Sequence, residues 1–165
     1  MKILIFSDSH GQAYGMRRAL SMHPDADAVF FLGDGLADVL SVRSETLASW
    51  FCVCGNCDIG YRLTDIACTA VDTVTLCGRR ILFTHGDAFG VKYGMAPLLS
   101  EAKAREADIV LFGHTHEPTE LCVTEADRPI YLFNPGTVGG RGGKMTFGLL
   151  TLTERDVLFS HGCIV

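Results

Sequence analysis

Seven side chains with the chemistry of metal ligands recur along this chain in five groups. They are two aspartates, one asparagine and four histidines: Asp8, His10, Asp34, Asn56, His85, His114 and His116. Carboxylate, imidazole and carboxamide ligands without thiolates suit divalent ions such as manganese, iron, cobalt, nickel or zinc. Seven ligands exceed what one tetrahedral ion uses, but they suit two ions that share a carboxylate. The set therefore predicts a dinuclear metal site.

Almost every group follows a short apolar run, which indicates how the chain positions the ligands. The runs occupy residues 3–6, 29–32, 50–53, 81–83 and 109–112. Short apolar runs bounded by glycine or polar residues are typical of buried strands. Ligands of open α/β sheets bind at the carboxyl ends of the strands. We therefore expect the strands to bring these groups to one site, with the centrally placed Asp34 as the bridge.

The rest of the chain predicts helices outside two packed sheets. Helical patterns cover residues 12–22, 36–47 and 95–106, and a hairpin joins 71–76 to 81–83 through residues 78–80. Further strands are expected near 120–124, 130–133, 146–152 and 156–161. The front half alternates strand and helix, and the back half is mostly antiparallel. We expect an α/β fold and a single domain over residues 1–165.

Composition excludes several classes of function. The 165 residues are 48% hydrophobic, with no stretch that resembles a transmembrane helix or a signal peptide. The net charge of −5, with dispersed basic residues, argues against a stable nucleic-acid polymer or an anionic membrane as a partner. Seven cysteines, mostly in or beside expected strands, favour a reduced cytoplasmic protein. Cys52 and Cys54 are expected to be structural.

The ordered motifs resemble those of the calcineurin-like metallophosphoesterases. The motifs are Asp8-Ser9-His10, Gly33-Asp34-Gly35-Leu36-Ala37-Asp38, Gly55-Asn56-Cys57-Asp58, Thr84-His85-Gly86 and Gly113-His114-Thr115-His116. The similarity is greater to the small, single-domain bacterial and archaeal phosphodiesterase branch, and it runs from residue 1 to about 143. This resemblance implies a four-layer αββα sandwich of two mixed β-sheets flanked by helices.

The resemblance also divides the ligands between two divalent ions, of which manganese is favoured. It assigns Asp8, His10, Asp34 and His116 to one ion, and Asp34, Asn56, His85 and His114 to the other. The implied activity is hydrolysis of a small phosphodiester by a metal-activated water, with Asn56, Cys57, His85 and His114 as the catalytic residues. The alternatives are a protein-interaction scaffold, as in the retromer subunit of the same branch, and a phosphomonoesterase. A homo-oligomer is left open.

Two positions depart from the family pattern. Cys57 stands where many larger members carry a histidine that protonates the leaving group. A thiol with a pKa near 8.5 is a poorer proton donor than an imidazolium, so we expect a preference for good leaving groups such as aryl phosphodiesters. Asp87 replaces a histidine of the site in small members, and its charge is expected to repel an anionic substrate.

Three further residues have two interpretations each. Asp38 and Asp58 follow ligand motifs, so they are either hydrogen-bond partners that orient ligands or caps of a helix. Arg141 belongs to a glycine-rich segment, residues 134–143, whose backbone amides are suited to holding a phosphate. A plain hairpin explains the same segment.

Overall fold

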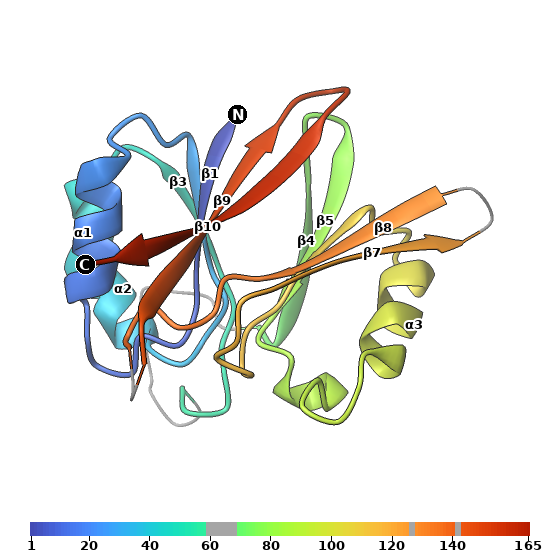
Figure 1. The fold of residues 1–165 in the computed structure, drawn as a ribbon, viewed down its shortest axis with the longest axis horizontal. Coiled ribbons are helices and arrows are strands. Elements are labelled where there is room, and N and C mark those ends of the chain that lie inside the picture. Colours follow the sequence, from blue (N-terminus) through green and yellow to red (C-terminus); the bar gives the residue numbers. More distant parts are fainter. Residues whose placement is uncertain (59–68, 126–127, 141–142) are drawn as a thin grey trace.

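Two five-stranded sheets packed face to face form the centre of this computed structural model, which describes residues 1–58, 69–125, 128–140 and 143–165 (Figure 1). The first sheet has the order β10-β9-β1-β2-β3, formed by β10 (Val157–Ile164), β9 (Met145–Leu152), β1 (Lys2–Phe6), β2 (Ala28–Phe31) and β3 (Ser49–Cys52). The second has the order β4-β5-β6-β8-β7, formed by β4 (Val71–Leu76), β5 (Arg79–Thr84), β6 (Ile109–Leu111), β8 (Arg128–Asn134) and β7 (Thr119–Glu125).

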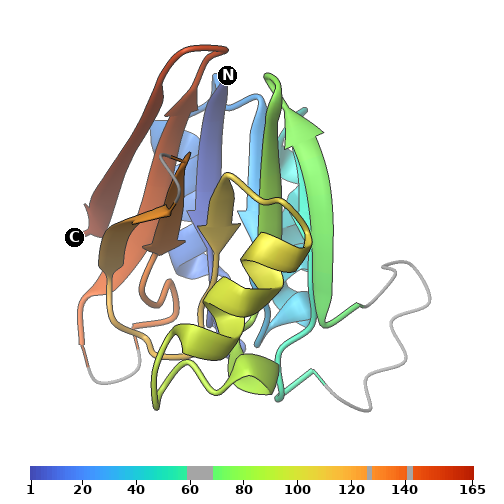
Figure 2. The same ribbon diagram turned by 90° about the vertical axis from the view of Figure 1, so that its right-hand side faces the viewer.

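Helices cover the outer faces of both sheets, which confirms the expected αββα sandwich. On the first sheet lie α1 (Tyr14–Met22) and α2 (Leu36–Val42), and on the second lies α3 (Ala96–Ala104), as Figures 1 and 2 show. Two short 3-10 helices, η1 (Arg43–Glu45) and η2 (Asp87–Phe89), complete the described elements. None of the helices in these ranges has the length and apolar character needed to cross a lipid bilayer.

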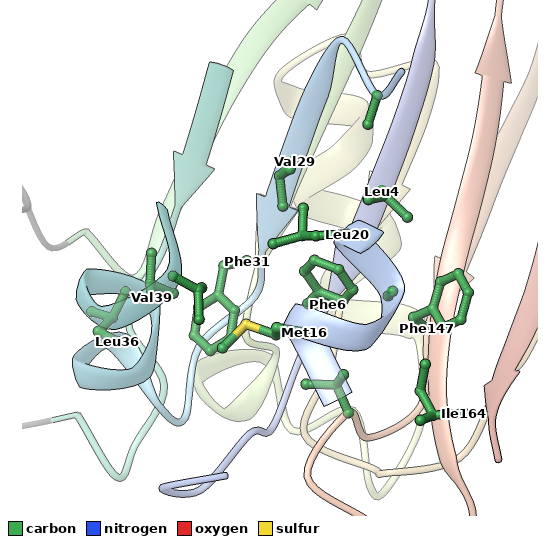
Figure 3. Packing of buried hydrophobic residues seen from close by; sticks show 14 residues of the cluster. Leu4, Phe6, Met16, Leu20, Val29, Phe31, Leu36, Val39, Phe147 and Ile164 are labelled. Carbon is green, nitrogen blue, oxygen red and sulfur yellow. The ribbon is translucent and has the colours of Figure 1, made fainter. Parts of the chain in front are cut away.

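Strand β1 shows why the apolar runs are continuous rather than alternating. Ile3 and Ile5 face the second sheet, whereas Leu4 and Phe6 face the helices on the other side (Figure 3). Successive side chains of a strand point to opposite faces, so a strand covered on both faces must be apolar at every position. All four side chains are fully buried. On the outer face of the second sheet, Leu82 and its neighbours pack against α3.

The strand order brings the ends of five strands to one side of the molecule. In the first sheet β1, β2 and β3 run parallel, and in the second β5, β6 and β8 run parallel. The back half of the chain is mostly antiparallel, as its sequence predicts, although β6 pairs in parallel with both neighbours. The parallel arrangement places the loops after β1, β2, β3, β5 and β6 together, where the ligand motifs lie.

The hairpin between β4 and β5 is confirmed, but its turn is displaced from the expected residues 78–80. The turn consists of Cys77 and Gly78, with φ of 47° and 73°. Positive φ at both central residues matches the right-handed twist of the flanking strands. Arg79 and Arg80 therefore begin β5. The helix expected over 36–47 likewise ends earlier, at Val42, and η1 follows it.

The cysteines differ from the expectation of buried, reduced thiols. Cys54 is disulfide-bonded. Cys57, Cys122 and Cys163 are exposed. Cys52 fits its structural prediction, because burial in β3 raises the pKa of its thiol to about 12 and keeps it protonated.

Candidate metal centre

The backbone is unusual at the ligand motifs. Among the described residues, seven other than glycine have positive φ, and five of them are expected ligands: Asp8, His10, Asp34, His114 and His116. Aspartate and histidine tolerate this left-handed region better than most residues do, but it still costs free energy. The left-handed backbone conformation at these five motif positions directs their side chains in ways that an ordinary loop would not.

Asp8 lies fully buried directly after β1. Its Oδ2 accepts hydrogen bonds from Ser7 Oγ at 2.5 Å and from the backbone N–H of His114 at 3.1 Å. Its Oδ1 accepts no hydrogen bond in the described structure, although His116 Nε2 lies 3.0 Å away. A buried carboxylate oxygen without a donor is costly unless a cation faces it.

Four imidazoles surround Asp8 and Asp34 in two opposed pairs. The Nε2 atoms of His10 and His116 are 3.3 Å apart, and His114 Nδ1 lies 3.1 Å from His85 Nε2. His10 Nε2 lies 3.6 Å from Asp8 Oδ1 and 4.0 Å from Asp34 Oδ2. Ring nitrogens that face each other at these distances need a proton or a metal ion between them.

His85 is held by its other ring nitrogen. The ring is fully buried after β5, and Nδ1 donates a hydrogen bond of 2.8 Å to the carbonyl of Leu32. This bond fixes the tautomer, so Nε2 points toward Asp34 Oδ2 at 3.5 Å. A buried, oriented imidazole whose free nitrogen faces carboxylates is typical of a metal ligand.

The charges of the site shift the pKa values of its residues in opposite directions. Burial alone raises the pKa of Asp34, but a hydrogen bond and charge from His85, with donors from Cys57, lower it well below its usual value. Burial lowers the pKa of His85, but Asp34 and Asp8 raise it overall. The pKa of His114 is lowered by burial and by the charges of His85 and Lys92. Asp34 thus stays ionised and attracts a cation.

Among the described residues, donor atoms that lie within 4.8 Å of one another define three groups that could hold a metal ion. They are Asp8 with His10 and His116, Asp8 with Asp34 and His85, and His10 with Asp34 and Cys57. The first two contain five of the seven expected ligands. His114 joins through its contact with His85. The amide Nδ2 of Asn56 lies 3.4 Å from Cys57 Sγ, at the exposed edge of the site.

A cavity of about 300 Å³ adjoins the centre. It is lined by His10, Gly11, Asp34, Gly35, Ala37, Asp38, Cys57 and Asp58. Asp38 lies in the first turn of α2, where its Oδ2 accepts hydrogen bonds from Ser9 Oγ at 2.5 Å and Gly11 N at 2.8 Å. Asp38 therefore supports the loop that carries His10. Asp58 is buried and accepts hydrogen bonds from the loops of Asp34 and Gly55.

Sequence reasoning missed several supporting residues. Thr137 Oγ1 donates to the carbonyl of Asp8 at 2.8 Å, and Ser7 holds the Asp8 carboxylate. Asn134 Nδ2 donates to the carbonyl of Gly113 and to Thr115 Oγ1, which holds the loop of the last two histidines. The Asn134-Pro135-Gly136 start of the glycine-rich segment was a signal for this contact.

The two remaining candidates are placed differently. Asp87 is partly buried at the start of η2, and its charge acts on His114, as does that of Lys92. Lys92 is a cation near the site that no motif indicated. Arg141 lies outside the described residues, so its expected role beside a phosphate stays a prediction.

Comparison with known proteins agrees with this geometry. Residues 1–155 match the family model of the calcineurin-like phosphoesterase superfamily domain. A probable metallophosphoesterase of Bacillus subtilis, YsnB, is 30% identical over 139 residues, which are 84% of this chain and 75% of that protein. A solved archaeal phosphodiesterase has a TM-score of 0.77 and 23% identity, covering 99% of this chain and 100% of that one.

One further structural neighbour is named for protein sorting rather than for an enzymatic activity. Zn²⁺-bound Vps29 of Entamoeba histolytica, a vacuolar protein sorting protein, has a TM-score of 0.75 and 18% identity, covering 99% of each chain. At this identity the likeness shows the fold alone. The family model and the Bacillus relative decide the assignment, because they cover most of the sequence. This chain belongs to the calcineurin-like phosphoesterase superfamily.

Proposed function

We propose that this protein is a metal-dependent phosphodiesterase that hydrolyses small phosphoesters with two divalent ions, manganese being favoured. The observation that carries the proposal is the pair of opposed imidazole pairs around Asp8 and Asp34. Two carboxylates with four converging imidazoles form a donor set for two ions rather than one. The Oδ1 atom of Asp8, which accepts no hydrogen bond, fits a position beside a cation.

The proposed division of the ligands between two ions follows the two histidine pairs, one ion for each pair. One ion is assigned to Asp8, His10, Asp34 and His116, and the other to Asp34, Asn56, His85 and His114. Asp34 is the proposed bridge, since its Oδ2 lies 4.0 Å from His10 Nε2 and 3.5 Å from His85 Nε2. The amide Nδ2 of Asn56 donates to the Cys57 thiol, and its oxygen is the atom proposed to bind.

Asp34, His85 and Cys57 have separate roles in the proposed reaction. When bound, two divalent ions lower the pKa of a water and offset the negative charge of a phosphate. Asp34 remains anionic because its pKa is depressed, and the bond to Leu32 keeps His85 Nε2 directed inward. Hydrolysis then adds water to phosphorus and breaks the ester bond, and the departing oxygen takes up a proton. An aryloxide is a good leaving group and departs without early protonation. This property suits a site in which a thiol, that of Cys57, is the available proton donor in place of an imidazolium.

The charge of the cavity favours diesters over monoesters. Among the described residues, its lining contains Asp34, Asp38 and Asp58 but no lysine or arginine. A phosphodiester carries one negative charge, whereas a phosphomonoester carries up to two, so the carboxylates repel the monoester more strongly. This argument agrees with the presence of a named phosphodiesterase among the structural neighbours.

A direct assay tests the proposal. Metal-stripped protein is reconstituted with manganese, nickel, zinc or iron and assayed on bis(4-nitrophenyl) phosphate and 4-nitrophenyl phosphate. We expect turnover that requires metal and favours the diester. Asp34→Asn should abolish this turnover while circular dichroism shows a folded protein.

The rival function is a protein-interaction scaffold, for which the Vps29 neighbour is the supporting observation. A scaffold should show negligible turnover with every metal, in the parent protein as well as in Asp34→Asn. Turnover by the parent that the substitution removes therefore separates the two functions.

A further inference from the structure

One buried carboxylate joins the two loops that carry Asp34 and Asn56. Asp58 Oδ2 accepts hydrogen bonds from the backbone N–H groups of Asp34 at 2.7 Å and Gly55 at 2.9 Å. Its Oδ1 accepts from Gly35 at 2.9 Å and Leu36 at 3.0 Å. Four backbone donors from two separate loops thus end on one side chain, which is 5% exposed.

We propose that Asp58 is a positioning residue that creates the ion position shared by Asp34 and Asn56, so that without Asp58 the second ion binds far more weakly than the first. This inference rests on the proposed function, since it concerns the same metal centre. It assigns Asp58 no contact with metal or substrate. The residue acts through the backbone of the two loops.

The contact between the loops is reciprocal and tight. While Asp58 binds the loop of Asp34, the Oδ1 of Asp34 accepts a hydrogen bond of 2.7 Å from Cys57 N. A Cβ atom added to Gly55 would lie 2.1 Å from Asp34 Oδ1 and 2.6 Å from Asp34 N. The loops therefore pack backbone to backbone, and a buried carboxylate between them has no substitute in solvent.

The effect should be confined to one half of the centre because the other half is held independently. The backbone N–H groups of Asp8 and His10 donate to the carbonyls of Gly33 and Asp34, both at 3.0 Å. Val138 N donates to Ser7 O, and Thr137 Oγ1 donates to Asp8 O. None of these bonds uses Asp58. The Asp34 loop thus keeps its attachment to the Asp8 loop, whereas Asn56 loses its fixed position.

The substitution Asp58→Asn retains the size of the side chain but turns one acceptor oxygen into a donor. An amide group would then face two N–H groups that have lost their acceptor. Substitution of a residue that orients a metal ligand typically lowers metal affinity 10–100-fold. We expect the parent protein to bind two Mn²⁺ in calorimetric titration, and Asp58→Asn to bind one with near-parent affinity and the second roughly 10–100-fold more weakly.

Paramagnetic resonance provides a second readout that a general loss of stability would not move. Mn²⁺ ions in a coupled pair and an isolated Mn²⁺ ion give different spectra. At the same added concentration of Mn²⁺, the parent should show the coupled signal and Asp58→Asn the isolated one.

The matched control is Asp108→Asn. Asp108 also accepts a backbone hydrogen bond, from Arg80 N at 2.8 Å, and pairs with Arg128, but it lies before β6, at the opposite end of that strand from His114. Its substitution should lower stability and leave both Mn²⁺ affinities unchanged. Gly55→Ala provides an independent route, because its methyl group forces the two loops apart while Asp58 is retained. This variant decides the question if Asp58→Asn does not fold.

The outcomes are distinct. Selective loss of one ion in Asp58→Asn or Gly55→Ala supports the inference. Two ions bound with parent affinities, or equal weakening of both, overturns it and leaves the proposed function standing. A parent protein that binds fewer than two ions overturns the proposed dinuclear function itself, and the inference with it.

Discussion

The Nε2 atom of His116 lies 3.0 Å from the Oδ1 atom of Asp8, and that oxygen accepts no hydrogen bond in the described structure. Asp8 follows the first strand, whereas His116 follows β6 of the other sheet. The two sheets thus each contribute one side of the metal centre. A buried charge that faces imidazoles without a proton between them stores unfavourable free energy, which a bound cation would release.

Asp8→Asn should therefore change stability and metal binding in opposite directions. Removal of the buried charge should stabilise the metal-free protein by about 1 kcal/mol, the usual gain when a functional site is relaxed. Metal affinity should fall by more than the roughly 100-fold that loss of a supporting partner costs. Urea unfolding in the presence of a chelator and Mn²⁺ titration measure the two effects. A variant that is less stable and still binds metal would contradict the role of Asp8.

The raised pKa of His85 predicts the pH dependence of the metal-free protein. Its pKa in the folded state lies above the unfolded value of 6.5, because Asp34 and Asp8 outweigh burial. A raised histidine pKa contributes stability that is fully present below 6.5 and is lost as pH rises through the folded pKa. The difference in unfolding free energy between the parent and His85→Gln should thus be larger at pH 5.5 than at pH 9. Chelator-treated samples are required, and an equal difference at both pH values would refute the prediction.

Cys57→His should broaden the range of leaving groups. An imidazolium protonates a departing alkoxide better than a thiol does, and general acid catalysis contributes about 10²–10⁴-fold where it operates. We expect the rate on alkyl diesters to rise by about tenfold or more, with a smaller change on aryl diesters. Rates across diesters of graded leaving-group pKa measure this, and Cys57→Ser is the control. A parent enzyme with a flat dependence, chemistry being rate-limiting, would count against the idea.

Asp87→Asn should strengthen the binding of anionic substrates. Asp87 is partly buried and its charge acts on His114, so it also acts on an anion beside that residue. Removal of one partly solvated charge is worth about 0.5 kcal/mol, so KM for a diester should fall by about twofold with little change in kcat. The effect should shrink at high salt. Glu117→Gln, a change at an exposed carboxylate that follows His116, is the control.

The sequence predicted the fold class and the elements that carry the ligands, because a strand buried on both faces must be apolar throughout. The runs before Asp8, Asp34 and His85 are therefore visible without coordinates. The turn at Cys77 and Gly78 was predicted too late in the chain. The two arginines after Gly78 were assigned to the turn, but they pair with β4. The parallel pairing of β6 with β8 was also missed, because register between distant strands leaves no local pattern.

For the site, the types and order of the seven ligand candidates came from the sequence alone, whereas the two departures at Cys57 and Asp87 came from the resemblance to the family. Only the tertiary structure decided which side chains face each other: His10 with His116, and His85 with His114. It also showed that four hydrogen bonds to Asp58 join two loops. The physical reason is that ligand chemistry belongs to each residue, whereas distance and burial arise only when the two sheets pack together.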